Sequence, residues 1–266
     1  MELIGRISKG SKMDQIYLPK NRTGFASGEY VIILPLQSKL QEKQKKEAKE
    51  YLYGIKSLEP IKLGAIKEIF ALINKHLNTE NIVITGSFLE LGFKFNDIDI
   101  LIINEQKSNL ESLEKQIENS LGIRPHIIQI SQQALLSGLS TDPLYSLMLS
   151  KCISRNRLIF KAKRKINYKM LDLHLLKSKV LIDNFDILSG DEKYYFTLNL
   201  VSILLFIQNK KVSKEIVNKE IETLFGISVD KIKDNLISKK EFIKKYKKIY
   251  DKTFNLIMGN IKNEQK

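Results

Sequence analysis

Two aspartates separated by one residue, Asp97 and Asp99, begin the strongly apolar segment DIDILII at residues 97–103. Alternate side chains of a β-strand project to the same side, so we expect these two carboxylates to lie together. Carboxylates held that close repel each other unless a cation lies between them. Mg²⁺ usually takes one or two carboxylates and completes its octahedron with water and substrate phosphates. The pair therefore predicts a magnesium site, with Mn²⁺ as the other candidate ion.

A small-residue corner precedes this strand. Gly86 and Ser87 follow the apolar run IVIT and open a short segment expected to be helical. Glycine lets a backbone approach a phosphate closely, and a serine hydroxyl and the free amides of a helix N-terminus can donate to its oxygens. Phosphate and metal would then meet in one cleft. In the alternative, Asn96 and Asp97 simply begin a strand after a turn and Asp99 lies on an exposed edge.

The apolar strand, Gly86-Ser87, nine further residues and the Asp-x-Asp strand together resemble the signature of the DNA polymerase β-like nucleotidyltransferase superfamily. The resemblance covers residues 62–130 well. It implies that Asp97 and Asp99 are catalytic and hold Mg²⁺, and that Gly86 and Ser87 bind the phosphates of a nucleoside triphosphate such as ATP. The implied reaction is attack by a hydroxyl on the α-phosphorus, with release of pyrophosphate.

Members of that superfamily commonly carry a third carboxylate on a later strand. The corresponding segment here, IRPHIIQI at residues 123–130, contains neither Asp nor Glu. His126 stands at about that place, with Gln129 as the other polar candidate. A neutral histidine can take the proton of the attacking hydroxyl, so His126 is the third catalytic candidate. A histidine satisfied by hydrogen bonds on a sheet face is the alternative.

A further candidate, Lys193, opens the helix expected over residues 191–209. Related enzymes use residues of such a helical region to hold the base or the triphosphate, so the resemblance places Lys193 in nucleotide binding.

The N-terminal 37 residues are expected to form a small β module, because short apolar runs alternate there with turn residues. The strand end Pro19-Lys20, the turn glycine Gly24 and the strand start Gly28-Glu29 resemble AbrB-like swapped-hairpin domains. That resemblance implies a homodimer and contact with DNA. A small module used only for packing is the alternative.

The rest of the chain is expected to divide into three parts. Residues 38–59 predict an exposed linker helix, 60–140 a nucleotidyltransferase-like mixed α/β core, and 141–266 a basic helical bundle. Within the core, apolar periodicity predicts a helix from Pro60 to Leu77, strands at 81–85, 97–103 and 123–130, and a helix near 108–121. In the bundle it predicts helices near 143–152, 168–182, 191–209, 213–225 and 239–262. The predicted fold class is α+β.

The formal net charge is +14, and residues 151–266 alone carry 26 Lys/Arg against 13 Asp/Glu. Such an excess attracts polyanions, including RNA, although a lysine-rich composition can also simply solvate helix faces. The one cysteine, Cys152, can form no internal disulfide. The N-terminus lacks a signal-peptide core, and the apolar run at 198–207 is too short to span a membrane. We therefore expect a cytoplasmic protein without membrane contact.

The sequence is compatible with two functions. The first is a Mg²⁺-dependent nucleotidyltransferase that transfers a nucleoside monophosphate from a nucleoside triphosphate to a hydroxyl on RNA or on a protein. The second is a non-catalytic nucleic-acid-binding protein that keeps a degenerate nucleotidyltransferase site.

Overall fold

The computed structural model describes residues 7–10, 14–16, 50–159 and 163–264. The chain divides into two compact units, residues 1–47 and 48–266. In the first unit, β1 (Ile7–Ser8) and β2 (Gln15–Ile16) form an antiparallel pair in which Ile7 lies opposite Ile16. The residues that carry the AbrB-like resemblance lie outside the described residues, as does the linker region up to residue 49.

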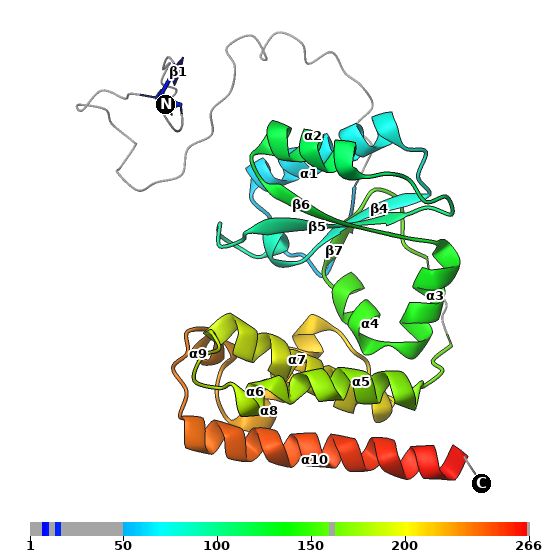
Figure 1. Cartoon of the computed structure of the whole chain (residues 1–266), viewed down its shortest axis with the longest axis vertical. Helices are drawn as coiled ribbons and strands as arrows, with labels where there is room; N and C mark the ends of the chain where they lie inside the picture. The colour runs from blue at the N-terminus through cyan, green and yellow to red at the C-terminus, as the bar shows by residue number, and fades with distance from the viewer. Residues whose placement is uncertain (1–6, 11–13, 17–49, 160–162, 265–266) are drawn as a thin grey trace. The chain divides into compact units, whose positions relative to one another are not determined.

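The second unit is built on a five-stranded mixed sheet (Figure 1). Its strands, in spatial order, are β3 (Tyr51–Tyr53), β7 (Cys152–Ser154), β4 (Asn81–Thr85), β5 (Asp97–Ile103) and β6 (Arg124–Ile130). All neighbours are antiparallel except β5 and β6, which run parallel. The helix between β5 and β6 makes the crossover that a parallel pair requires.

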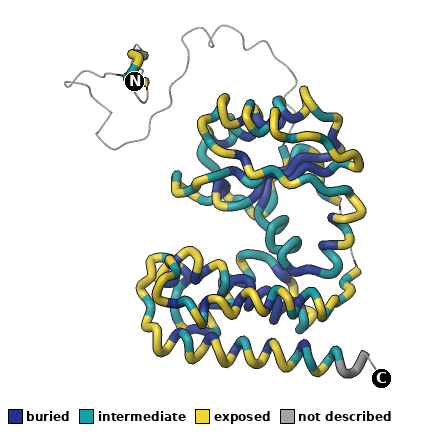
Figure 2. The backbone as a smooth tube through the Cα atoms, viewed as in Figure 1, coloured by how far each residue is buried: buried dark blue, intermediate teal, exposed yellow. Residues whose placement is uncertain are grey.

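Two helices cover one face of this sheet: α1 (Pro60–His76) and α2 (Glu111–Leu121). The strands contribute Ile82, Ile84, Ile98, Ile100 and Ile102 to this core, all at most 1% exposed. On the opposite face a smaller cluster around Val83, Leu101 and Cys152 packs against α3 (Gln132–Thr141) and α4 (Pro143–Leu149). Figure 2 shows the burial concentrated in the strands and in the inner sides of the helices.

The C-terminal bundle is organised around α7 (Gly190–Ile207), whose last two-thirds are almost wholly buried. Its partners are α5 (Tyr168–Ser178), α6 (Val180–Asp183), α8 (Lys214–Phe225), α9 (Val229–Lys233) and α10 (Lys239–Glu264). Ser189 and Glu192 form a capping box at the start of α7, which fixes where this apolar helix begins. No helix among the described residues is both long and apolar enough to cross a membrane.

The α+β fold class is confirmed, with a mixed sheet and a C-terminal helical bundle. Two short strands were not predicted. Residues 51–53 fall in the expected linker helix but form β3, because the sequence YLY suits a strand and finds a free edge on β7. Residues 152–154 lie at and beyond the end of a predicted helix but form β7, which pairs with β4 inside the sheet.

Cys152 provides a test of this packing. Its side chain is fully buried, and burial raises the pKa of the thiol to about 12. We expect an alkylating reagent at pH 8 to modify the native protein at a rate set by unfolding, because the thiolate is the reactive form. Since the chain has no other cysteine, labelling followed by mass spectrometry reports this residue alone. Native labelling as fast as in urea would contradict the burial.

Candidate active site

Two of the predicted site residues, Asp99 and His126, lie side by side on the sheet face opposite α1 and α2. The register places Thr85 of β4 opposite Asp99 of β5, and Asp99 beside His126 of β6. His126 Nδ1 lies 3.0 Å from Asp99 Oδ1. Both side chains remain accessible, His126 at 60% and Asp99 at 37%. Three residues from three strands thus form one row, in which Asp99 and His126 are accessible to solvent and Thr85 is buried.

The Gly86-Ser87 corner lies directly against this row. Gly86 has a φ of 85° and precedes a short 3₁₀ helix, η2 (Ser87–Leu89). A Cβ atom at Gly86 would lie 2.0 Å from Asp99 Oδ2, so only glycine leaves room for the carboxylate. Ser87 is exposed beside it. The corner and the second aspartate are therefore packed together.

Asp97 lies two residues before Asp99 on β5, on the same side of the strand, with Arg124 as its neighbour on β6. Among the described residues, no group of three His, Cys, Asp or Glu side chains is arranged to hold a metal ion by itself. Two partly exposed carboxylates nevertheless match the donors that Mg²⁺ takes from a protein when phosphates and water supply the rest. The residues fit an ion that arrives with a phosphate ligand.

The remaining candidates lie elsewhere. Gln129 accepts from the backbone N–H of Ser108 at 3.1 Å and donates to the carbonyl of Gln106, so it fastens a loop beyond the row. Lys193 is 2% exposed, bonds Asn235 Oδ1 at 2.6 Å and stacks on the Phe185 ring inside the bundle. The structure does not bring Lys193 to the row.

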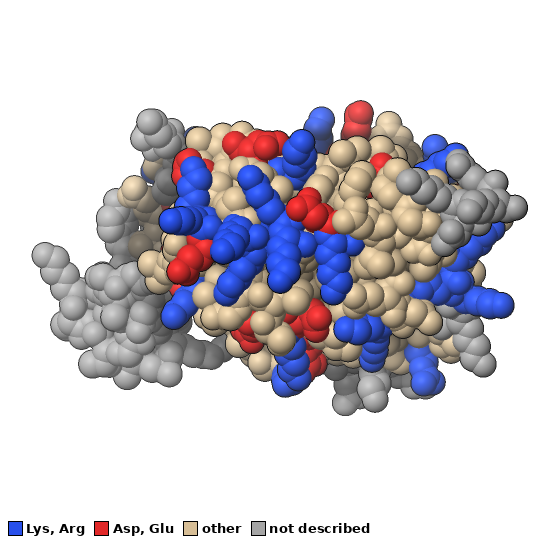
Figure 3. All heavy atoms as spheres, turned by 90° about the horizontal axis from the view of Figure 1, so that it is seen from below, with Lys and Arg blue, Asp and Glu red and all other residues tan. Residues whose placement is uncertain are grey.

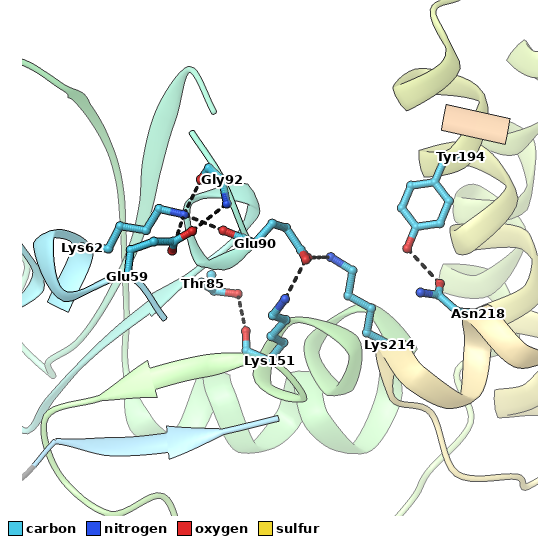
Figure 4. A network of polar contacts seen from close by, with 9 residues as sticks. All are labelled: Glu59, Lys62, Thr85, Glu90, Gly92, Lys151, Tyr194, Lys214 and Asn218. Atoms are coloured by element: carbon cyan, nitrogen blue, oxygen red, sulfur yellow. Dashed lines mark hydrogen bonds and ion pairs between the residues drawn. The ribbon is translucent and has the colours of Figure 1, made fainter. Parts of the chain in front are cut away.

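A buried lysine missed by the sequence reasoning holds the loop between the corner and the aspartates. Lys62 of α1 is 1% exposed, and its Nζ donates to the carbonyls of Glu90 at 2.5 Å and Gly92 at 2.6 Å (Figure 4). Glu59 Oε2 lies 3.1 Å from the same nitrogen, and Glu59 Oε1 accepts from the Gly92 N–H. The ammonium also lies 5.3 to 5.7 Å from three aromatic ring centroids, those of Phe88, Phe93 and Phe95.

The side chain of Glu90 points the other way, toward the bundle. Its carboxylate accepts from Lys151 Nζ at 2.6 Å and from Lys214 Nζ, at the start of α8 (Figure 4). Burial acts to raise the pKa of Glu90, but the hydrogen bonds from Lys151 and Lys214 outweigh it and lower the pKa from 4.5 to about 2. The Thr85 hydroxyl ties this region to the row, because it donates to the carbonyls of Met148 and Lys151.

A cavity of about 1090 Å³ opens at Glu90, between the sheet domain and the bundle. It is lined by the loop after β3, by Leu89 to Leu91, by the end of α4 and by the start of α8. Gly86, Ser87, Asp97, Asp99 and His126 do not line it. The Asp99 row and the cavity are therefore distinct features joined by the loop of residues 86–96.

No protein-family model matches the chain, and no curated protein matches it. One similar solved structure is a nucleotidyltransferase, spectinomycin adenyltransferase AAD(9) from Enterococcus faecialis with ATP and spectinomycin. The identity is 16%, the TM-score is 0.41, and the match covers 76% of this chain and 100% of that one. So distant a likeness decides nothing about function.

The contact between Gly86 and Asp99 predicts unequal effects of two alanine substitutions. Gly86→Ala should destabilise the protein by about 2 kcal/mol or more, because backbone strain adds to displacement of the carboxylate. Gly92→Ala should cost only about 1 kcal/mol, because Gly92 also has a positive φ but a Cβ there meets nothing within 4 Å. Urea unfolding measures both.

An Asp99→Ala background supplies the control for this pair. It removes the atoms nearest to the new Cβ and leaves Asp99 Cβ, 3.3 Å away. The cost of Gly86→Ala should fall there, while that of Gly92→Ala should not change. Equal costs of Gly86→Ala in both backgrounds would show that Asp99 does not press on the corner.

The lowered pKa of Glu90 predicts a pH dependence of stability. The group loses its proton near pH 4.5 in the unfolded chain and near pH 2 in the folded one, so its stabilisation is present above pH 4.5 and disappears toward pH 2. The stability of the wild type relative to Glu90→Gln should shrink across that window in urea titrations. In a Lys151→Met, Lys214→Met background the trend should disappear or reverse, because burial then acts alone and raises the pKa of Glu90. A difference independent of pH would contradict the two ion pairs.

Proposed function

We propose that the chain is a nucleotidyltransferase that moves a nucleoside monophosphate from a nucleoside triphosphate to a hydroxyl acceptor. The observation that carries the proposal is the row of Thr85, Asp99 and His126 with Gly86 packed against Asp99. A phosphate-binding corner, a pair of carboxylates and a proton acceptor then share one accessible sheet face.

In this proposal the corner binds the phosphates. The Ser87 hydroxyl donates to a phosphate oxygen, and the open backbone at Gly86 allows the close approach. Asp97 and Asp99 would hold Mg²⁺ or Mn²⁺ through their carboxylates. When bound, such an ion neutralises phosphate charge and lowers the pKa of a coordinated hydroxyl.

His126 takes the place of the third acid as proton acceptor. With its Nδ1–H donating to Asp99 Oδ1, the Nε2 atom carries the lone pair and faces away from the carboxylate. The acceptor oxygen forms a bond to the α-phosphorus and its proton passes to His126 Nε2. The bond between the α-phosphorus and the bridging oxygen breaks, and pyrophosphate leaves with that electron pair.

For the acceptor, the charge distribution favours an RNA end over a protein hydroxyl. Lysines gather on the face of the bundle that carries α10 (Figure 3). Lys240, Lys244 and Lys247 are exposed at i, i+4 and i+7, along one side of this helix. A phosphate backbone lying across such a stripe gains from counterion release, so acceptor binding should weaken steeply with salt.

The proposed activity is tested with α-labelled nucleoside triphosphates, Mg²⁺ or Mn²⁺, and either total RNA or cell protein. We expect label on RNA, and its loss in an Asp97→Asn, Asp99→Asn double variant whose stability is measured in parallel. Label on protein would reassign the acceptor. Transfer that persists in the double variant would show that the site is elsewhere.

The proton-acceptor role predicts different results for two substitutions of His126. His126→Asn should lower kcat by about a hundredfold while nucleotide affinity is retained, because a general base contributes to the chemical step. His126→Asp restores a carboxylate at the position and should retain more activity than His126→Asn. Equal activity of the wild type and His126→Asn, in single-turnover kinetics, would exclude His126 from the chemistry.

A second candidate function has its own observation. The two β6 residues beside the aspartates, Arg124 and His126, are nitrogen donors rather than carboxylates. Nitrogen donors in place of a third carboxylate would suit a protein that binds a nucleotide or nucleic acid without catalysing nucleotidyl transfer. Protection against thermal unfolding by a nucleoside triphosphate, with no transfer of label to any acceptor, would favour this function.

A further inference from the structure

The cavity beside the Asp99 row is strongly cationic. Its walls carry two carboxylates, Glu90 and Glu215, against six cationic side chains: Lys56, Lys151, Arg164, Lys211, Lys214 and Lys233. The first turn of α8 adds the positive end of a 12-residue helix. Clustered cations in a recess of this kind attract a multiply charged anion far more than a single carboxylate.

Glu90 already occupies the most convergent pair of these cations. Lys151 and Lys214 come from opposite walls, the former from the sheet domain and the latter from the bundle, and both bond the same carboxylate. Their side chains are 22% and 28% exposed, so the ion pairs are partly shielded from water. The pKa of Glu90, lowered to about 2, reflects how strongly this pair of ammonium groups favours an anion between them.

The backbone of Glu90 is fixed independently of its side chain. Its carbonyl oxygen is held by Lys62, which is buried on the far side of the loop. The carboxylate can therefore leave the two lysines by rotation about side-chain bonds, while the loop of residues 86–96 keeps its place. Such rotamer changes are fast and need no rearrangement of the fold.

We propose that this cavity is a binding site for a chain of phosphates, and that the Glu90 carboxylate is a resident anion which the ligand displaces from Lys151 and Lys214. The volume of about 1090 Å³ accommodates a nucleotide-sized molecule as well as a free polyphosphate. Glu90 therefore competes with the ligand for Lys151 and Lys214. The apparent affinity of the protein for the ligand is proportional to the fraction of molecules in which the carboxylate has left these lysines. The site is separate from the Asp99 row and does not require nucleotidyl transfer.

The test is calorimetric titration of the full chain with inorganic triphosphate, without divalent metal and at low salt. Glu90→Gln should lower the dissociation constant by about tenfold or more, because the amide is a weaker competitor for the ammonium groups. The matched control is Glu215→Gln, which removes the same charge from the lining of the same cavity, on the wall formed by α8, but leaves Lys151 and Lys214 paired to Glu90. That control should change the constant by less than about threefold, as expected for a solvent-screened charge.

Two further variants locate the ligand. Adding Lys214→Met to Glu90→Gln should abolish the gain, whereas adding the Asp97→Asn, Asp99→Asn pair should leave it intact. ATP is titrated alongside to identify the source of the phosphates. If Glu90→Gln raises the affinity for ATP as much as that for triphosphate, the ligand is a nucleotide. If it raises only the affinity for triphosphate, the ligand is a free polyphosphate.

Three results would overturn the proposal. They are absence of triphosphate binding in both wild type and Glu90→Gln, equal gains in Glu90→Gln and Glu215→Gln, and loss of the gain in the Asp97→Asn, Asp99→Asn background. The first shows that there is no anion site, the second that only overall charge matters, and the third that the ligand lies at the Asp99 row. Because no transfer is measured, none of these results depends on the nucleotidyltransferase activity.

Discussion

The register of β4 against β5 is the constraint on which the site depends. Side chains alternate along a strand, so a slip of one residue would turn the Asp97 and Asp99 carboxylates into the core beneath α1 and α2. The isoleucines prevent such a slip: Ile82, Ile84, Ile98 and Ile100 fill that core and are at most 1% exposed. The same alternation that buries them places Thr85 and Asp99 opposite each other on the other face. Hydrophobic burial thereby positions the polar residues.

The second requirement is a loop that leaves the corner and returns to the strand in a fixed path. Lys62 fixes this path by binding the loop from inside the protein. Burying its ammonium group is unfavourable in free energy unless the charge is paired and hydrogen-bonded. Two carbonyls, the Glu59 carboxylate and three aromatic rings provide that compensation. Each of these partners comes from the loop or from the residue before α1. The buried charge therefore specifies one path for the loop, since a different path would leave the ammonium unsatisfied.

Sequence reasoning reached the parts of this arrangement that depend on local pattern. The strands 81–85 and 97–103 have the predicted bounds, and His126 lies beside Asp99 because β6 continues the sheet next to β5. The roles of Lys62 and Lys214 could not be predicted from the sequence. In a lysine-rich chain, the residues next to a lysine do not indicate whether it is buried or which group it binds. The choice of Lys193 shows the same limit: helix position suggested a role, but the tertiary packing turned that side chain into the bundle. Strands β3 and β7 were missed since three-residue strands have too few side chains for alternation to be visible.

Two nitrogen-bearing side chains on β6, Arg124 and His126, bear on how the fold accommodates the repulsion between Asp97 and Asp99. In a site with a third acid, mutual repulsion makes a cation part of the folded state, so metal binding and stability are coupled. Here His126 bonds Asp99 directly, and Arg124 is the strand neighbour of Asp97. The polypeptide itself thus supplies a partner for Asp99. In the proposed nucleotidyltransferase, a metal ion would neutralise the charge of the phosphate that approaches the same two carboxylates.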